Sequence, residues 1–216
     1  MSTRTRAHPS IYVLAGTNGA GKSSVAGAVI RARGADYFNP DEATCRILEA
    51  NPGIELREAN SHAWLQGKRL LEKAIASRME FAFETTLGGN TVPALLGRAH
   101  DAGLAVRVWY VGLEGAGLHI ARVRARVAAG GHDIPEAKIR ERYRRSRENL
   151  IRLLPKLTEL RLFDNSAEGD PRLGGIPRPR LILHMLDRKI RETCEVTEVP
   201  GWAKPIFVAT LRHSQI

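Results

Sequence analysis

The feature that constrains this chain most is a glycine-rich run near its N-terminus. It reads G-x-x-x-x-G-K-S, the pattern of a loop that wraps the phosphates of a nucleoside triphosphate. An apolar, β-prone run at 11–15 precedes it, and a Pro-free run rich in Ala and Val at 24–33 follows it. A strand, a glycine loop and a helix in this order direct backbone N–H groups and a helix N-terminus at one point, where polyphosphate binds. This context disfavours the alternative, a chance glycine-rich turn. The run consists of Gly16, Thr17, Asn18, Gly19, Ala20, Gly21, Lys22 and Ser23.

The motif predicts roles for its last residues. Lys22 is expected to reach the β- and γ-phosphates of ATP, and the Ser23 hydroxyl to ligate Mg²⁺. We predict that the ATP-binding residues are those from Gly16 to Ser24. A GTPase would also need a base-specific Asn-Lys-x-Asp segment, which the sequence lacks.

Length and composition favour one α/β domain. The chain has 216 residues, 43% of them hydrophobic, which is enough for a full core. Its motifs fall within about 10–166, and the C-terminal extension, 167–216, has no role that the sequence reveals. The two cysteines lie far apart, which favours a reducing compartment. No stretch approaches the ~20 apolar residues of a membrane span, so we predict a cytoplasmic protein without a membrane partner.

Periodicity and composition indicate the remaining elements. Residues 55–79 read as one long helix and 91–102 as another. Residues 104–112 are a nearly continuous apolar strand, as a parallel sheet covered on both faces requires. Residues 160–165 read as the last strand, and 181–195 as a helix.

A candidate general base follows residues 37–39, which read as a short second strand or its end. Asn39 is a good helix N-cap, Pro40 suits the first helical position and Glu42 completes a capping-box pattern. Asp41 is therefore either an acid favoured by the helix dipole or a carboxylate at a strand end beside the phosphate loop. In the second position it would accept the proton of a substrate hydroxyl.

A second carboxylate ends the β-prone run at 81–86. Glu84 lies in this apolar strand, with Thr85 and Thr86 after it. Burying an unpaired carboxylate is costly, so Glu84 needs a reason. It would either serve magnesium-bound water, bind substrate hydroxyls, or cap the following turn at Gly88.

The region from 119 to 150 is strongly basic, and a Gly-Gly pair at 130–131 divides it into two helices. Most of its arginines are expected on solvated helix faces. One or two would form a lid over the triphosphate, because guanidinium is permanently charged and binds phosphate in a bidentate manner. The arginines are Arg122, Arg124, Arg126, Arg140, Arg142, Arg144, Arg145 and Arg147.

Together these segments resemble the zeta-toxin family of phosphate-loop kinases, in order and spacing, from about 10 to 166. The resemblance rests on five segments: the loop at 15–24, Asn-Pro-Asp-Glu at 39–42, the strand and its end at 81–87, the 126–136 segment and Leu-Phe-Asp-Asn at 162–165. It implies the P-loop NTPase fold. That fold is a three-layer α/β/α arrangement with a mostly parallel central sheet, here with an arginine-rich helical lid.

The resemblance also implies an activity: ATP- and Mg²⁺-dependent phosphorylation of a sugar nucleotide such as UDP-N-acetylglucosamine, by an enzyme that can have an antitoxin partner. By position, Asp41 matches the general base, Glu84 and Thr86 match substrate-site residues, and Arg126 matches an ATP-binding arginine. The sequence departs from the family at His132, where toxins of the family carry an arginine. Arg122, Arg140 or Arg144 would have to replace it.

Two alternatives remain at this point. One is a kinase with the same core that acts on another nucleotide, an antibiotic or an RNA end. The other is a nucleic-acid-binding protein with a regulatory nucleotide site, suggested by the net charge of +10. Aromatic residues make up only 6% of the chain and are not interleaved with the arginines, as stacking on single strands would require. Nucleic acid is therefore the less favoured partner.

Overall fold

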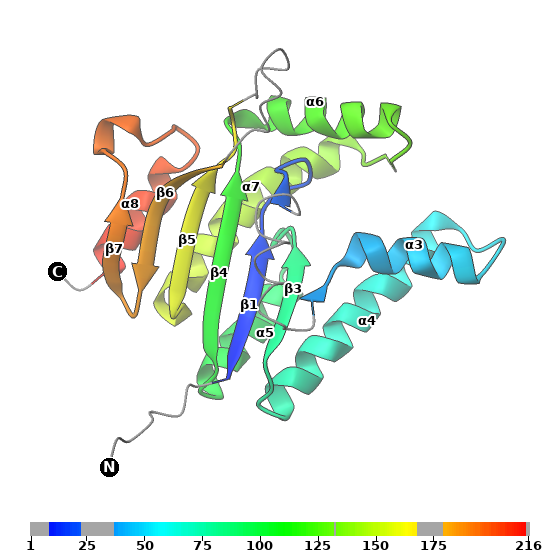
Figure 1. The fold of residues 1–216 in the computed structure, drawn as a ribbon, viewed down its shortest axis with the longest axis horizontal. Coiled ribbons are helices and arrows are strands. Elements are labelled where there is room, and N and C mark those ends of the chain that lie inside the picture. The colour runs from blue at the N-terminus through cyan, green and yellow to red at the C-terminus, as the bar shows by residue number, and fades with distance from the viewer. Residues whose placement is uncertain (1–8, 23–36, 132, 168–178, 215–216) are drawn as a thin grey trace.

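A seven-stranded sheet forms the centre of the molecule (Figure 1). The structure, a computed structural model, describes residues 9–22, 37–131, 133–167 and 179–214. The strand order is β2-β3-β1-β4-β5-β6-β7. The strands are β1 (Ser10–Ala15), β2 (Tyr37–Phe38), β3 (Phe81–Thr85), β4 (Ala105–Gly112), β5 (Glu159–Asp164), β6 (Arg180–Leu186) and β7 (Lys189–Thr193).

Five of these strands run parallel, and β1 lies in the middle of them. It pairs with β3 on one side and with β4 on the other, with Val13 opposite both Phe83 and Val108. The carboxyl ends of parallel strands meet at one edge, where an open α/β sheet binds its ligands. The loops after Ala15, Thr85 and Gly112 therefore start side by side.

Helices cover the sheet and complete the α/β architecture. The largest hydrophobic cluster joins one face of the sheet to α4, α5, α7 and α8. A second cluster, with Leu14, Trp109 and Val111, lies on the opposite face. The helix expected at 24–33 falls outside the described residues. The described helices of three turns or more are α3 (Pro40–Ala50), α4 (Leu56–Ala76), α5 (Thr91–Asp101), α6 (Gly115–Ala128), α7 (Glu136–Leu153) and α8 (Lys204–His213). None of them is long and apolar enough to cross a membrane.

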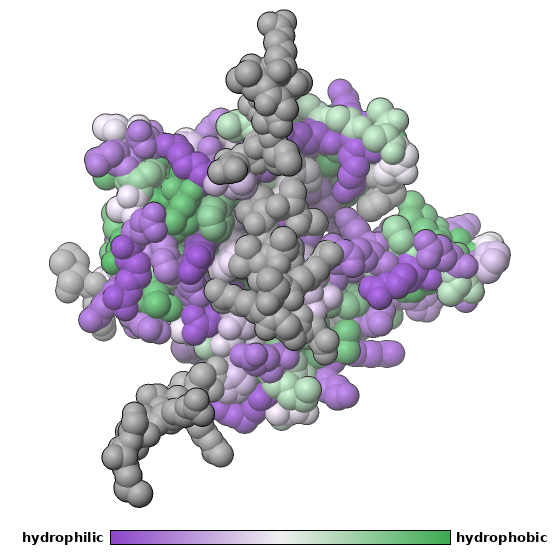
Figure 2. All heavy atoms as spheres, in the orientation of Figure 1, coloured by the Kyte–Doolittle hydropathy of each residue, from purple (hydrophilic) through white to green (hydrophobic). Residues whose placement is uncertain are grey.

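The basic region forms a helical hairpin of α6 and α7, as the Gly-Gly pair predicted. Gly130 adopts φ +91° after the end of α6, and Gly131 N donates to the Arg126 carbonyl (2.9 Å). The hairpin has its own small core, which includes Ile120, Val123 and Ile139. On the face shown in Figure 2, hydrophilic residues are prominent on both α3 and α6.

The sequence-based assignment was wrong after β5. The predicted helix at 181–195 is the hairpin of β6 and β7, so 160–165 is not the last strand. The reversal occurs at Asp187 and Arg188, which have φ of 51° and 61°. Two successive positive φ values form the turn that matches strand twist, although neither residue is a glycine. A short apolar run is compatible with either a helix or a strand, so the sequence did not distinguish the two here.

Candidate active site

The glycine-rich loop after β1 depends on its glycines. Gly16, Gly19 and Gly21 have φ of +146°, +79° and +78°, which side-chain-bearing residues rarely adopt. A Cβ on Gly16 would lie 2.2 Å from the Val111 carbonyl oxygen. Gly16 N in turn donates to the Thr85 carbonyl (3.2 Å), so the loop is held against both neighbouring strands. Ser23 and Ser24 lie outside the described residues, and their assigned contacts remain predictions.

Lys22 and Glu84 meet at the carboxyl edge of the sheet. Lys22 is only 7% exposed, and its Nζ lies 3.3 Å from Glu84 Oε1. Glu84 Oε2 accepts hydrogen bonds from Tyr37 Oη (2.8 Å) and Asn39 Nδ2 (3.4 Å). These partners compensate the cost of burying the carboxylate. Glu84 therefore binds partners at the sheet edge and does not merely cap the turn that follows.

Asp41 fits both sequence interpretations. Asn39 Oδ1 accepts from Asp41 N (2.9 Å) as the N-cap of α3, and Pro40 occupies the first turn. The Asp41 carboxylate is also 51% exposed, with its Oδ2 3.8 Å from Arg126 Nη1. The structure thus brings the predicted base and the predicted lid arginine together.

One cavity of about 560 Å³ joins most of these groups. Of the predicted catalytic and substrate-binding residues, Lys22, Asp41, Glu84 and Thr86 line it. Arg126 does not line it but pairs with Asp41. Its walls come from the phosphate loop, the start of α3, one side of α4, the loop after β3 and the start of α7. The remaining lining includes Asn18, Phe38, Asn39, Asn60, Trp64, Lys68, Thr85, Gly88, Gly89, Ile134, Lys138, Glu141, Arg142 and Arg145.

Arg142 is a site residue that sequence reasoning did not single out. Its Nη1 donates to Asn18 Oδ1 in the phosphate loop (2.8 Å), and its side chain packs on Gly88, where a Cβ would lie 2.9 Å from Arg142 Cγ. Burial lowers the pKa of the guanidinium, while Asp41 and Glu141 raise it. The signal was the helical period: Arg142 shares a face of α7 with buried Ile139 and Ser146, three residues before it and four after.

The three arginines expected to replace the family arginine contact other groups. Arg122 Nη2 donates to the Ala167 carbonyl (3.4 Å). Arg140 pairs with Glu136 (3.9 Å) and Arg144 with Glu148 (3.0 Å), both within α7. None of the three lines the cavity.

The phosphate loop is also tied to α6 through a buried histidine. His119 is 1% exposed, and its Nδ1 lies 2.8 Å from the Asn18 carbonyl oxygen. Burial lowers the pKa of His119 to about 4, with the Lys22 charge acting in the same direction. The ring is therefore neutral at pH 7, and its Nδ1–H donates to the loop.

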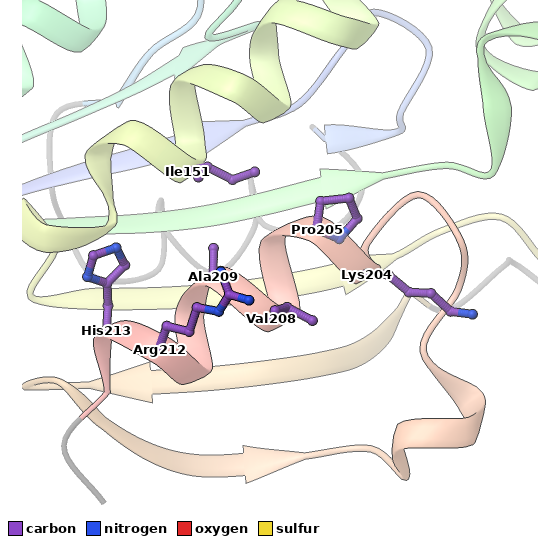
Figure 3. A pocket seen from close by; sticks show the side chains of 7 residues that line it. All are labelled: Ile151, Lys204, Pro205, Val208, Ala209, Arg212 and His213. Atoms are coloured by element: carbon purple, nitrogen blue, oxygen red, sulfur yellow. The ribbon is translucent and has the colours of Figure 1, made fainter.

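A second cavity, of about 570 Å³, lies between α7 and α8 (Figure 3). Ile151, Pro205, Val208 and Ala209 give it an apolar floor, and Lys204, Arg212 and His213 lie around it. It contains none of the predicted site residues and no carboxylate. The predicted catalytic and substrate-binding residues that line a cavity therefore all line the one beside Lys22.

Comparison with protein families gives one match that covers most of the chain. The family model described as Zeta toxin matches residues 1–167. An uncharacterized protein of Haemophilus influenzae is 32% identical over 132 residues, which are 59% of this chain and 88% of that protein.

Solved structures with the same fold cover nearly the whole chain. A chain of the AvrRxo1-ORF1:-ORF2 complex with ATP matches 95% of it at 15% identity, with a TM-score of 0.65. This chain spans 64% of that longer one. A chain of the PezAT chromosomal toxin–antitoxin system of Streptococcus pneumoniae also has this fold, at 13% identity and a TM-score of 0.58. The match covers 98% of the present chain and 89% of the PezAT chain. At these identities the likeness establishes the fold alone.

Proposed function

The chain belongs to the Zeta toxin family and has a P-loop kinase architecture, and from that premise we propose that it transfers the γ-phosphoryl group of ATP to a hydroxyl of a small molecule. The observation that carries the proposal is the cavity beside the phosphate loop. It presents a buried lysine, a carboxylate paired with that lysine, and a more exposed carboxylate at a helix start. These are the groups that a donor and an acceptor half of a phosphotransfer site need.

The donor half fits a triphosphate. Glycines set the path of the loop's backbone, and at Gly16 and Gly19 a Cβ would lie 2.2 and 2.7 Å from the carbonyl oxygens of Val111 and His119. A glycine-rich loop that leads into a helix is suited to bind phosphate oxygens with backbone N–H groups. Lys22 supplies the charge at the β- and γ-phosphates. ATP is present in the matched AvrRxo1 complex, and for this chain ATP binding is part of the proposal.

The acceptor half would work through Asp41. Its carboxylate takes the proton of the acceptor hydroxyl as that oxygen bonds to the γ-phosphorus, while the bond to the β–γ bridging oxygen breaks and ADP leaves. Arg126, 3.8 Å from Asp41, and Arg142, bonded to Asn18, offer guanidinium groups to the transferring oxygens. Thr86 would help orient the acceptor, as a hydroxyl on the wall of the same cavity.

Magnesium would complete the donor half by neutralising phosphate charge. Kinase sites hold Mg²⁺ with one or two protein ligands, substrate phosphates and water, so no all-protein cage is required. Ser23 is the proposed ligand, and Glu84, which pairs with Lys22, would bind metal-bound water. Among the described residues no cluster of three or more acidic, histidine or cysteine side chains forms a separate metal site.

The acceptor we propose is a sugar nucleotide such as UDP-N-acetylglucosamine. The cavity supports an acceptor with a ring, because Trp64 and Phe38 line it. Lys68 and Lys138 also line it, each paired with an acidic neighbour on its own helix. Another nucleotide, an antibiotic or an RNA end would use the same donor half. The nucleic-acid alternative gains nothing from α7, because Arg140, Arg144 and Arg145 all have acidic partners.

The test measures ATP consumption with a panel of UDP-sugars, other nucleotides and RNA ends. Wild type is compared with Lys22→Ala and Asp41→Asn, and we expect acceptor-dependent turnover that falls at least about 100-fold in each variant. Identical turnover in all three proteins would refute the kinase. Turnover restricted to an acceptor other than a sugar nucleotide would keep the kinase and replace its substrate.

A protein partner is a further part of the proposal. The matched chains come from an AvrRxo1-ORF1:-ORF2 complex and from a toxin–antitoxin system. If this chain acts as a toxin, inducing it should arrest growth while Asp41→Asn should not. Equal growth on inducing either protein would argue against a toxin and an antitoxin alike.

A further inference from the structure

The C-terminal region reaches the nucleotide end of the sheet through Trp202. This side chain is 2% exposed and belongs to the turn between the β6–β7 hairpin and α8. Its Nε1 donates to Asp164 Oδ1 (2.9 Å) at the end of β5, and its ring lies 6.1 Å from that of Tyr110 in β4. The residue lies beyond 167, where the family match ends.

Trp202 and the phosphate loop contact neighbouring residues at the end of β4. A Cβ on Gly112 would lie 2.3 Å from the Trp202 indole, so this position must be glycine for the indole to fit. The preceding carbonyl, that of Val111, is the atom that Gly16 approaches. Movement of the indole would therefore act on the strand end against which the phosphate loop rests.

A second route runs through hydrogen bonds. Besides Trp202, Asp164 Oδ1 accepts from Ser166 Oγ (2.5 Å), which itself accepts from Glu114 N (2.7 Å) at the start of α6. Between them in sequence, Asn165 N donates to the Gly112 carbonyl (3.0 Å).

The route ends in the loop itself. Asn165 is buried, and its Nδ2 donates to the carbonyl of Ala20, within the phosphate loop (2.9 Å). Trp202 is therefore linked to the loop in three steps: its hydrogen bond to Asp164, the peptide bond from Asp164 to Asn165, and the hydrogen bond from Asn165 to Ala20.

We propose that Trp202 is a positioning residue for ATP: its indole N–H fixes Asp164, and through Asn165 it fixes the phosphate loop. The inference rests on the proposed function, since it concerns the same ATP site. It assigns the C-terminal region a part in nucleotide binding. Simple packing is the competing explanation, and it predicts a loss of stability without a specific loss of ATP affinity.

The test is ATP binding measured by calorimetry in the presence of Mg²⁺, together with the melting temperature. Trp202→Phe keeps an aromatic ring in this turn and removes the N–H donor. It also removes the outer indole atoms that meet Gly112, so the variant loses packing as well as the hydrogen bond. We expect the Kd for ATP to rise about three- to tenfold, the range for residues that act through a network. Phe207→Leu is the matched control, because Phe207 is a buried ring of α8 in the same hydrophobic cluster as Trp202 and has no hydrogen-bonding group in its side chain. It should lower the melting temperature and leave the Kd unchanged.

A double-mutant cycle separates the hydrogen bond from packing. Asp164→Ala should weaken ATP binding, and adding Trp202→Phe to it should weaken binding no further. Additive effects, an unchanged Kd in Trp202→Phe, or an equal rise in Phe207→Leu would each overturn the inference. A wild-type protein that binds no ATP would instead overturn the proposed function, and the inference with it. If Trp202→Phe does not fold, Asp164→Ala with the Phe207→Leu control decides.

Discussion

The two halves of the proposed site are built from different material. The donor half, Gly16 to Lys22, consists of buried backbone whose path is set by glycines and by contacts with two strands. The acceptor half consists of side chains on α3, α4 and α7 and in the loop after β3, and several of them, including Asp41 and Trp64, are about half exposed.

The difference indicates how such a site can keep its donor and change its acceptor. A loop whose shape depends on φ values above zero and on a carbonyl within contact distance tolerates almost no substitution. A half-exposed side chain on a helix can be replaced without altering the fold. Donor-half changes should therefore affect every acceptor equally, and acceptor-half changes should discriminate between acceptors.

The largest effect is expected from Gly16→Ala. The new methyl would lie 2.2 Å from the Val111 carbonyl at a φ of +146°, so the loop must move away from β4. We expect turnover to fall about 1,000-fold with every acceptor, comparable to losing a fixed electrostatic contact at the reacting centre. The control is Gly117→Ala, where a Cβ meets no atom within 4 Å and α6 should gain stability. Turnover that survives in Gly16→Ala would contradict the rigid-loop description.

Arg142→Ala should produce the next largest effect, because Arg142 lies where the halves meet. It contacts Asn18 on the donor side and lines the acceptor cavity. We expect kcat/KM to fall about 100-fold, the scale for removing a charged hydrogen-bonding group from a phosphoryl-transfer site. Arg144→Ala, on the exposed face of α7, should have no such effect. A similar loss in both variants would show that only the charge of the hairpin matters.

Arg142 also illustrates the limits of the sequence. The glycine loop, Asn39 as an N-cap and the parallel strands were predictable, because each depends on local geometry or on an apolar run that only a buried strand needs. The eight arginines in the basic region are chemically alike, so only their position relative to the family's motifs could distinguish them, and that position favoured Arg126. Arg142 is identified by its place on the buried face of α7.

The C-terminal region was less predictable for a different reason. The β6–β7 turn uses Asp187 and Arg188 at positive φ. Aspartate tolerates that conformation, but arginine gives no signal for it. The contact between Trp202 and Asp164 joins segments that only the folded sheet brings together.

Acid should lower the stability of the folded chain through His119, the buried histidine that holds the phosphate loop of the donor half. Its pKa is lowered to about 4 in the folded chain, whereas the ordinary value is 6.5. Between these values the unfolded chain binds a proton that the folded chain does not, so the free energy of unfolding decreases as the pH falls. Relative to pH 7, the lowered pKa of His119 reduces the free energy of unfolding by about 2 kcal/mol at pH 5. Above pH 7 it causes no such reduction.

His119→Gln keeps an N–H donor for the Asn18 carbonyl and cannot titrate. Denaturant unfolding at pH 7 and pH 5 should therefore show a smaller acid-dependent loss in this variant than in wild type. His100→Gln, an exposed substitution on α5, should retain the wild-type dependence. Identical pH dependence in all three proteins would contradict a neutral, buried His119.

The smallest effect separates the halves most clearly. Trp64 is 45% exposed and lines the cavity from α4, away from the phosphate loop. Trp64→Ala should raise KM for the acceptor about fivefold, equivalent to about 1 kcal/mol for a lost aromatic contact, and leave KM for ATP unchanged. Trp64→Phe should restore most of the acceptor affinity, because it keeps a ring face. If KM for ATP rose as much as KM for the acceptor, the two halves would form a single binding unit, and substrate choice could not be altered on α4 without cost to the donor side.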